Sequence, residues 1–441
     1  MPSIAAIILA AGKGTRMKSD LPKVMHLVAG RPLLDYPLTL IQQLKIPATT
    51  LVVAKDHAPI RAFLKNRAVN GTQLAIQDPP LGTGHAVMSA FKKRSPKAKH
   101  YLILSGDVPL VSRETIQKLI AAHQAKNAAL TLVTASLDSP GAYGRVVRAP
   151  SGQVTGIVEM RDASPQEAEI KEINLAIYLI EAEFLKSSLT LLTPNNSQKE
   201  YYLTDLVRLA AAQGRTIETI FAAHPYEGMG VNNRKEILQM EKMIMAERLA
   251  SYSEAGVRFV NPDGIYIDAE VTIGAGTVVY GPNYLLGKTK IGADCVIKAY
   301  CYIEDSSVAE KALIGPFAHL RPGSEIGPEA KIGNFVEIKK SKIGAGSKVN
   351  HLSYIGDAVI GKKVNVGAGT ITCNYDGVNK FKTVLEDGVF VGSDTQFVAP
   401  VRVGKGAYIG AGSTITKNVK PGSLALTRTE QKEIRNWKRK K

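Results

Sequence analysis

The sequence predicts an α/β domain with a mainly parallel sheet in its first half and a parallel β-helix in its second half. Up to about residue 230, short apolar runs alternate with helix-like segments, and this alternation favours βαβ units. From about residue 267, branched or long aliphatic residues recur every six positions. A period of six cannot come from an α-helix and is typical of hexapeptide β-helices. The length of 441 residues leaves room for two or three domains.

The first half places its apolar runs where strands of one sheet are expected. Strands are predicted at 4–10, 49–54, 73–77, 101–107 and 129–136, with helices at 34–44 and 113–126. Ligands of parallel sheets bind at the carboxyl ends of the strands. A site is therefore expected in the segments that follow these apolar runs.

A single long helix is expected between the two halves. Asn233 can cap its start, Glu236 stands three residues later, and Gly256 can end it. We therefore expect the chain to have three parts: a first domain over 1–234, a helical linker over 235–255 and a β-helix domain with a basic tail over 256–441.

The six-residue series is long and regular. It runs from Ile267 to Ile303, continues from Val308 to Val366 with a few five-residue steps, and resumes from Val391 to Ile415. Each aliphatic residue should point into the coil, so that stacked coils share one core. Cys295 and Cys301 fall on the small position four residues after an aliphatic one, which predicts a core role for both.

Composition narrows the class of protein. Three cysteines, an odd number without a C-x-x-C pair, argue against a disulfide framework and a zinc site. The apolar start lacks a basic region before it, and no apolar run approaches a membrane span of about 18 residues. These features favour a cytoplasmic protein without a membrane partner.

The formal charge of +17 favours polyanionic partners, either nucleic acid or nucleotides and sugar phosphates. Part of the excess lies in the end of the chain, where residues 428–441 hold seven Arg or Lys against two Glu. This basic tail is either a solvated terminus or a binding segment.

The stretch "LAAGKGTRM" at 9–17 follows the first apolar run. It lacks the third glycine of a dinucleotide fingerprint and the pattern of a P-loop. It can be a plain turn, or a glycine-rich turn whose N–H groups face an anion. Arg16 and Lys23 can neutralise phosphates, and Asp107 stands at a strand end, where it can be a turn residue or a metal ligand.

A second group of polar residues lies on the hexads. His351 occupies a position near a turn where side chains point outward, and Arg321, Lys339 and Tyr354 recur on stacked hexads. Two of these are cationic and suit a sugar phosphate. Cys373 raises an acyl-cysteine route, but the sequence supplies it with no base, so direct transfer is favoured.

Several motifs together resemble a known family. The first half carries "LAAGKGTRM", "LPK" at 21–23, "LGTGHA" at 81–86, "SGDVPL" at 105–110, "GIVE" at 156–159 and "EIN" at 172–174, which resemble sugar nucleotidyltransferases. The second half carries "RPG" at 321–323, "GNFVEIKKSKIGAGSKVNHLSYIGDA" at 333–358 and "VGAGTITCNYDG" at 366–377. Over nearly its whole length the chain resembles the bacterial family of bifunctional N-acetylglucosamine-1-phosphate uridylyltransferases/glucosamine-1-phosphate N-acetyltransferases.

The resemblance implies a Rossmann-like nucleotidyltransferase domain with a mixed, mainly parallel sheet, followed by a left-handed β-helix in a homotrimer. The implied activity is acetyl transfer from acetyl-CoA to glucosamine 1-phosphate, then uridylyl transfer from UTP to N-acetylglucosamine 1-phosphate with Mg²⁺. The product, UDP-N-acetylglucosamine, is a precursor for peptidoglycan and lipopolysaccharide. Residues 257–300 depart from the family pattern, because they appear shorter and lack an H-G-x-D segment near Asp268. The number of early coils is therefore open.

The resemblance also assigns residues to two sites. At the uridylyl site Arg16 and Lys23 act on the phosphates, Asp107 and Asn232 hold the metal, and the nucleotide and sugar are bound by Leu9, Ala10, Ala11, Gly12, Lys23, Gln77, Gly82, Thr83, Ser105, Gly106, Asp107, Gly144, Glu159, Asn174 and Asn232. Gly144, Glu159 and Asn174 of this set hold the N-acetylglucosamine. At the acetyl site His351 is the general base, glucosamine 1-phosphate is bound by Arg321, Lys339, Tyr354 and Asn365, and acetyl-CoA is contacted by Ala368, Asn374, Tyr375, Ser393, Ala411 and Arg428.

Two other functions stay open at this point. The chain can be a sugar-phosphate uridylyltransferase whose β-helix only trimerises, or a basic scaffold that binds nucleic acid. The scaffold lacks a reading motif on a recognisable nucleic-acid fold, and no nucleic-acid partner is expected. Turnover of glucosamine 1-phosphate with acetyl-CoA separates the first alternative from the bifunctional enzyme.

Overall fold

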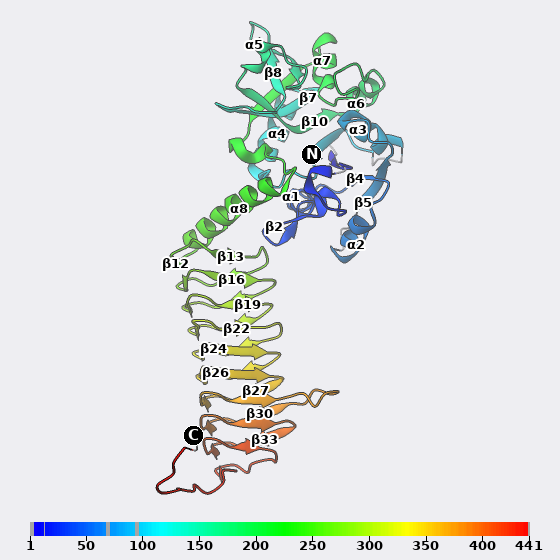
Figure 1. Cartoon of the computed structure of the whole chain (residues 1–441). Helices are drawn as coiled ribbons and strands as arrows, with labels where there is room; N and C mark the ends of the chain where they lie inside the picture. The colour runs from blue at the N-terminus through cyan, green and yellow to red at the C-terminus, as the bar shows by residue number, and fades with distance from the viewer. Residues whose placement is uncertain (1–3, 13, 68–70, 93–96, 440–441) are drawn as a thin grey trace. The chain divides into compact units, whose positions relative to one another are not determined.

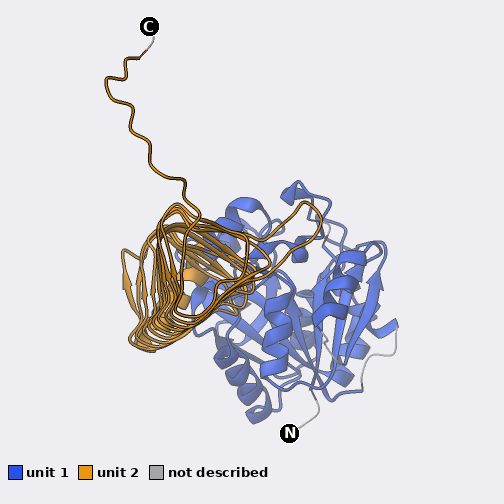
Figure 2. Cartoon of the chain, turned by 90° about the horizontal axis from the view of Figure 1, so that it is seen from below, with its two compact units in different colours: residues 1–241 blue, residues 242–441 orange. Residues whose placement is uncertain are grey.

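The structure is a computed structural model, and it describes residues 4–12, 14–67, 71–92 and 97–439. The chain forms two compact units, Met1–Glu241 and Lys242–Lys441, which are described in turn (Figure 2). Among the described residues, the search for a helix long and apolar enough to cross a membrane finds none.

The first unit is built on a mixed, mainly parallel sheet, as the sequence predicts. Within the described residues its strand order is β11-β7-β10-β6-β1-β4-β5, and β8 and β9 extend it beside β10. The pairs β1–β4, β1–β6, β4–β5 and β7–β11 are parallel, and β10 runs antiparallel to β6 and β7. The strands are β1 (Ile4–Ala10), β4 (Thr49–Ala54), β5 (Thr72–Gln77), β6 (His100–Ser105), β7 (Leu130–Ser136), β8 (Arg145–Arg148), β9 (Val154–Val158), β10 (Glu172–Glu181) and β11 (Ile217–Phe221).

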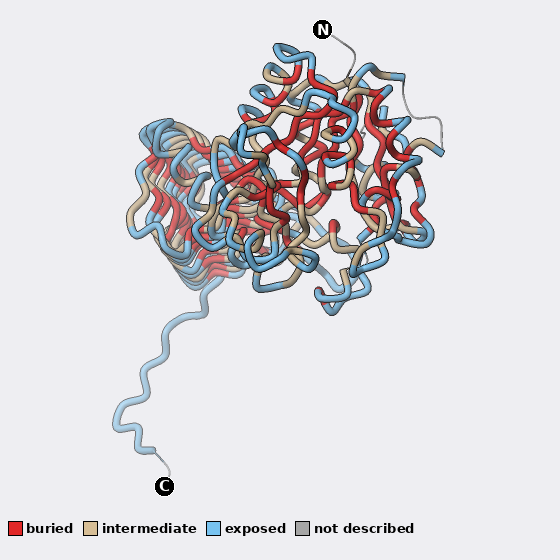
Figure 3. The backbone as a smooth tube through the Cα atoms, turned by 90° about the horizontal axis from the view of Figure 1, so that it is seen from above, coloured by how far each residue is buried: buried red, intermediate tan, exposed pale blue. Residues whose placement is uncertain are grey.

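Both faces of this sheet are covered. Ala5 and Ile7 of β1 belong to one apolar cluster, and Ala6 and Ile8 belong to the other. The strand is therefore apolar at every position rather than at alternate ones, and Figure 3 shows the buried backbone at the centre of the unit. The helices are α1 (Asp35–Gln43), α2 (Ala58–Arg67), α3 (Thr83–Lys92), α4 (Arg113–Ala125), α5 (Pro165–Ala168), α6 (Ala182–Leu189) and α7 (Asp205–Ala212). Short 3₁₀ helices cover Thr15–Met17, Lys23–Met25 and Pro225–Gly228, and a small hairpin joins β2 (Leu27–Val28) to β3 (Arg31–Pro32).

The long helix predicted between the halves is α8 (Arg234–Glu254). The side chain of Asn233 accepts a hydrogen bond from the backbone N–H of Glu236 at 3.0 Å, which is the predicted cap. The Glu236 carboxylate instead accepts from the backbone N–H of Asn232 at 2.6 Å. Gly256 follows the helix with a φ of 91°, a conformation that glycine adopts without strain.

The second unit is a parallel β-helix of three-sided coils, and Figure 1 shows how these coils stack. Ile267 stands opposite Leu285 on the next coil, and Leu285 stands opposite Ile303. One side is β12 (Arg258–Val260), β15 (Val278–Tyr280), β18 (Val296–Ile297), β21 (Leu313–Ile314), β28 (Asn365–Val366), β31 (Phe390–Val391), β34 (Tyr408–Ile409) and β36 (Leu424–Ala425). The second side is β13 (Ile265–Ile267), β16 (Asn283–Leu286), β19 (Tyr302–Glu304), β22 (His319–Leu320), β29 (Ile371–Cys373), β32 (Gln396–Val398) and β35 (Thr414–Ile415). The third is β14 (Thr272–Ile273), β17 (Lys290–Ile291), β20 (Ser307–Val308), β23 (Glu325–Ile326), β25 (Lys342–Ile343), β27 (Ala358–Ile360), β30 (Thr383–Leu385) and β33 (Val401–Val403).

Two strands run through the corner between the first two sides. These are β24 (Lys331–Lys339) and β26 (Lys348–Gly356), which pair in parallel along their length. The coils before them, from β12 onward, each have three complete sides. The region that departs from the family pattern therefore keeps the regular coil.

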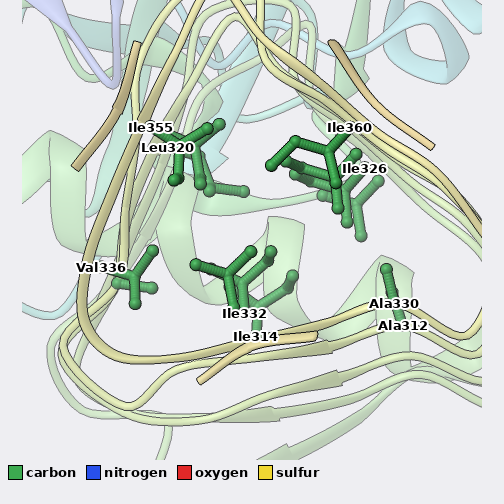
Figure 4. Packing of buried hydrophobic residues seen from close by; sticks show 14 of the residues in the cluster. Ala312, Ile314, Leu320, Ile326, Ala330, Ile332, Val336, Ile355 and Ile360 are labelled. Atoms are coloured by element: carbon green, nitrogen blue, oxygen red, sulfur yellow. The ribbon is translucent and has the colours of Figure 1, made fainter. Parts of the chain in front are cut away.

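The predicted hexad residues form the core of this unit. Ile314 and Ile332 stack on one side and Ile326 and Ile360 on another, as Figure 4 shows. Cys295 is 0% exposed and Cys301 is 1% exposed, so the predicted core role of both is confirmed. Burial raises the pKa of Cys301 to about 11, which keeps its thiol protonated and unreactive near neutral pH.

Candidate active sites

The first candidate site is a cleft of about 490 Å³ at the carboxyl ends of β1 and β6. Its lining includes many residues that the resemblance assigns to the nucleotide: Leu9, Ala10, Ala11, Gly12, Lys23, Gln77, Gly82, Thr83, Ser105 and Asp107. Strand ends of a parallel sheet are the expected place for a ligand. The structure thus brings together segments from four separate motifs.

Arg16, Lys23, Asp107 and Asn232 meet at this cleft. The Lys23 ammonium forms an ion pair with the Asp107 carboxylate and also donates to Oδ1 of Asn232 at 3.1 Å. Arg16 Nη2 donates to the same Oδ1 at 3.1 Å. The Lys23 ammonium therefore contacts side-chain oxygens of both Asp107 and Asn232, and the Arg16 guanidinium lies beside them.

Glycines make the close approaches in this cleft possible. Gly106 donates its N–H to the carbonyl oxygen of Leu9 at 2.8 Å, and a Cβ there would lie 3.0 Å from that oxygen. Gly82 has a φ of 97°, and a Cβ would lie 2.7 Å from the carbonyl oxygen of Tyr201. Gln77 donates from Nε2 to the Gly82 carbonyl at 2.9 Å, and this contact fixes the turn that leads into α3.

The three residues assigned to the sugar also lie together. The backbone N–H of Asn174 donates to the Gly144 carbonyl at 2.9 Å, and a Cβ on Gly144 would lie 3.5 Å from the Glu159 carboxylate. Burial raises the pKa of Glu159, while a hydrogen bond from Thr204 at 3.2 Å opposes that rise. A larger side chain at Gly144 would fill the space in front of this carboxylate.

Sequence reasoning missed several residues of this unit. Val24, Pro80, Ala86 and Glu200 also line the cleft. Glu227, which is 0% exposed, accepts hydrogen bonds from the start of α4 at Ser112 and Thr115 and from the backbone N–H of His224. Their roles depend on tertiary contacts, so no local motif marks them, although "EYYLTD" at 200–205 has the mixed polar and aromatic character of a site segment.

The second candidate site lies on the β-helix. Arg321 forms an ion pair with Glu337 at 2.8 Å, and Glu337 stands opposite Tyr354 in the register of β24 and β26. Partial burial, the Lys380 ammonium and the Arg321 guanidinium together lower the pKa of Lys339. Crowded cations of this kind favour a bound anion, so the Arg321 group, which consists of Arg321, Lys339 and Tyr354, can bind a phosphate. Glu337 and Lys380 were not predicted.

His351 is exposed at the corner that β26 turns, and its Nδ1 lies 2.9 Å from Oδ1 of Asn334 on β24. The same corner carries residues assigned to acetyl-CoA on the coils that follow. Asp394 donates its N–H to the Ala368 carbonyl at 2.7 Å, and Gly412 donates to the Ser393 carbonyl at 2.8 Å. These bonds stack Ala368, Ser393 and Ala411 along one edge.

Other assigned residues lie elsewhere on the coil. Asn365 stands opposite Lys348 and Phe390 on the first side, away from the Arg321 group. Asn374 donates to the Asp357 carboxylate at 2.5 Å, and Tyr375 is exposed in the loop between β29 and β30. The single chain therefore does not gather all the residues assigned to the acetyl site.

The tail begins beside the acetyl-CoA edge. The Arg428 side chain lies 3.7 Å from the position of a Cβ on either Gly410 or Gly412. Beyond it the described tail residues 429–439 are exposed and belong to no helix or strand, and the last two residues of the cluster Lys438–Lys441 lie outside the described residues.

Comparison with known proteins identifies the class of each half of the chain. Residues 6–166 match the MobA-like NTP transferase domain, and residues 305–340 and 382–417 match the bacterial transferase hexapeptide (six repeats). The fold and the two sites define a nucleotidyltransferase joined to a hexapeptide-repeat transferase, and the predicted α/β domain and left-handed parallel β-helix are confirmed.

Curated relatives define the family more closely. The chain is 46% identical to the bifunctional protein GlmU of Trichlorobacter lovleyi, over 99% of this chain and 98% of the relative. It is 44% identical to that of Geotalea daltonii and 42% identical to that of Desulfitobacterium hafniense, over 100% of both chains in each case. The chain belongs to this family of bifunctional uridylyltransferases and acetyltransferases, as its motifs predict. Both transferase activities, and not uridylyl transfer alone, are therefore those of the family.

Proposed function

We propose that the cleft of the first unit binds UTP and N-acetylglucosamine 1-phosphate, and that Asp107 and Asn232 hold Mg²⁺ there. The supporting observation is the pair of side-chain oxygens that share the Lys23 ammonium. Mg²⁺ prefers oxygen ligands and keeps several waters, so two protein ligands suit it. When bound, the ion neutralises phosphate charge.

In this proposal an oxygen of the sugar phosphate attacks the α-phosphorus of UTP, and the bond from that phosphorus to pyrophosphate breaks. The reaction needs alignment and charge neutralisation more than a protein nucleophile. Lys23 exchanges its contact with Asp107 for the phosphates, and Arg16 adds a second positive charge. Gly144, Glu159 and Asn174 hold the sugar so that its phosphate faces the nucleotide.

We propose that the β-helix carries the acetyl transfer. His351 takes a proton from the amine of glucosamine 1-phosphate as the nitrogen attacks the acetyl carbonyl, and the sulfur of coenzyme A leaves with the electron pair of the broken thioester bond. A general base of this kind contributes about 10²- to 10⁴-fold. Arg321, Lys339 and Tyr354 bind the sugar phosphate, and Ala368, Ser393, Ala411 and Arg428 contact acetyl-CoA along one edge of the coil.

A homotrimer would complete this acetyl site. Asn365 and Tyr375 lie away from His351 on one chain, and β-helices with flat sides can pack around a threefold axis in a closed assembly. The tail from Arg428 onward would then cross a seam between chains. We place the enzyme in the cytoplasm, where UTP and acetyl-CoA are made.

One coupled assay tests this function. Purified protein is supplied with glucosamine 1-phosphate, acetyl-CoA, UTP and Mg²⁺, and free thiol and pyrophosphate are measured separately. Release of both products supports two working sites. Pyrophosphate release from N-acetylglucosamine 1-phosphate without acetyl transfer would instead support a uridylyltransferase with a purely structural β-helix.

A further inference from the structure

The contact between Asn334 and His351 is held by the backbone rather than by the two side chains alone. Asn334 stands opposite His351 in the parallel register of β24 and β26, between the pairs Ile332–Val349 and Val336–Ser353. Because the two strands run unbroken through the corner, pairing on both sides of the contact fixes both backbones. The Asn334 and His351 side chains therefore leave the coil at the same level of the same corner.

The residues that follow reinforce this geometry. Phe335 has a φ of 55° and Leu352 has a φ of 44°, so each strand turns the corner directly after the contact. Ser353 also donates its hydroxyl to the carbonyl oxygen of His351 at 2.7 Å. The imidazole thus stands on a backbone that is hydrogen-bonded on both sides.

The residues that flank this contact along the described strands carry no charge. Asn334 faces it on β24, Asn350 and Leu352 flank it on β26, and the next coil passes this corner through Gly367 and Ala368. A hydrogen bond to an imidazole nitrogen therefore has the main influence on which nitrogen carries the proton.

We propose that Asn334 is a positioning residue for acetyl transfer. Its Oδ1 accepts a hydrogen bond from the protonated Nδ1 of His351, and the lone pair of Nε2 is then the base. This inference rests on the proposed role of His351. The amide is neutral, so it fixes the tautomer and the ring orientation without placing a charge beside the imidazole.

The test compares Asn334→Leu and Asn334→Asp with the unchanged full-length protein in acetyl transfer from acetyl-CoA to glucosamine 1-phosphate. The leucine removes the acceptor at similar size, and kcat should fall about tenfold, the upper end of what one net hydrogen bond supplies. KM for glucosamine 1-phosphate should change less than about twofold, because Asn334 is not placed on the substrate. Asn334→Asp restores an acceptor, so its kcat should recover at high pH.

The pH profile separates positioning from a structural effect. The carboxylate of Asn334→Asp raises the pKa of the imidazole, and the base form exists only above that pKa. The acid limb of kcat/KM should therefore move up by about one pH unit, which a merely structural role would not produce. Asn350→Leu is the matched control on the neighbouring position of β26 and should keep both the rate and the profile.

Two results would overturn the inference. If Asn334→Leu keeps the wild-type kcat and Asn334→Asp keeps the wild-type profile, while His351→Ala loses acetyl transfer, then His351 is the base and Asn334 does not position it. If His351→Ala keeps full acetyl transfer, the proposed base itself is wrong and the inference falls with it. Far-UV circular dichroism of the same preparations reports that the β-helix of each variant is folded.

Discussion

The backbone N–H of Val231 donates to the carbonyl oxygen of Asp107 at 3.0 Å. This one bond ties the segment before α8 to the end of β6, although 124 positions separate the two residues in the sequence (231 − 107). It brings the Asn232 amide to the Asp107 carboxylate. The metal site proposed above thus depends on this long-range backbone contact as much as on the identity of its two ligands.

Asp107→Ala should lower uridylyl transfer about 10²-fold or more, because it deletes the anionic metal ligand and the carboxylate partner of Lys23. Acetyl transfer should stay within about twofold. The measurement is each activity alone over a range of Mg²⁺ concentrations. Asp138→Ala is the control, since its side chain is 96% exposed and forms an ion pair with the surface residue Lys171. Equal loss of both activities in a folded Asp107 variant would contradict separate sites.

His351→Ala should lower acetyl transfer about 10²-fold or more and spare uridylyl transfer. Cys373→Ala, in the same assay, should retain acetyl transfer, since direct attack by the amine uses no protein thiol. A normal rate for the His351 variant across neutral pH would mean that another group is the base. A large loss in the Cys373 variant would favour an acyl-cysteine intermediate.

A chain ending at Thr427 should remain trimeric, keep uridylyl transfer and lose most acetyl-CoA binding. Thr427 is still anchored, because its hydroxyl accepts from the N–H of Thr414 at 2.7 Å, so the truncation removes Arg428 without opening the last coil. Sedimentation, acetyl-CoA titration and both assays measure the outcome. A chain ending at Arg435 is the matched control, which keeps Arg428 and removes the cluster Lys438–Lys441. Full acetyl transfer by the shorter chain would make the tail a solvated terminus.

The first unit should lose stability as the pH falls from about 6.5 to about 4. Burial lowers the pKa of His123 to about 4, and its ring bonds Thr131 at 2.8 Å and His100 at 2.9 Å. Between these pH values His123 binds a proton in the unfolded chain but not in the folded chain. The free energy of unfolding therefore rises with pH and falls on acidification. Thermal unfolding should show an acid-induced drop in Tm about 5 °C larger for the wild type than for His123→Gln. His224→Gln, at an exposed position, is the control, and its Tm should fall on acidification as much as that of the wild type. An equal dependence of Tm on pH in all three proteins would contradict this account.

The β-helix could be predicted from the sequence almost residue by residue, because a side-chain period of six leaves one arrangement that buries every aliphatic residue. In the first unit the apolar runs at β1 and β4 were located correctly, but β10, which runs antiparallel to its two neighbours, was not among the predicted strands. A strand buried on both faces has the same apolar character whether it runs parallel or antiparallel. Asn174 also depends on an irregularity between Asn174 and Tyr178 that no local pattern signals.

In the candidate sites, too, the residues with a local sequence signal could be predicted, and those placed by long-range contacts could not. Asp107 could be singled out because it follows a strand, and His351 because it occupies a defined hexad position. Lys23 could be singled out because it is a cation close to the glycine-rich turn. Asn232 came only from the resemblance, and Asn334, Glu227 and Glu337 were missed. Their partners are residues on other strands or other coils, and pairings of that kind are set by register and long-range contacts rather than by neighbours in sequence.

Stacked coils of the described β-helix pair with the coil before and the coil after them, so the stack can lengthen or shorten by whole coils. The corners also take up single residues, because stacked partners are 18 residues apart from Ile267 to Leu285 and 17 residues apart from Ile303 to Leu320. Length differences among members of this family are therefore expected at corners and in steps of a full coil, while the inward aliphatic positions stay in register. The corner that carries His351 would keep its geometry whatever number of coils precedes it.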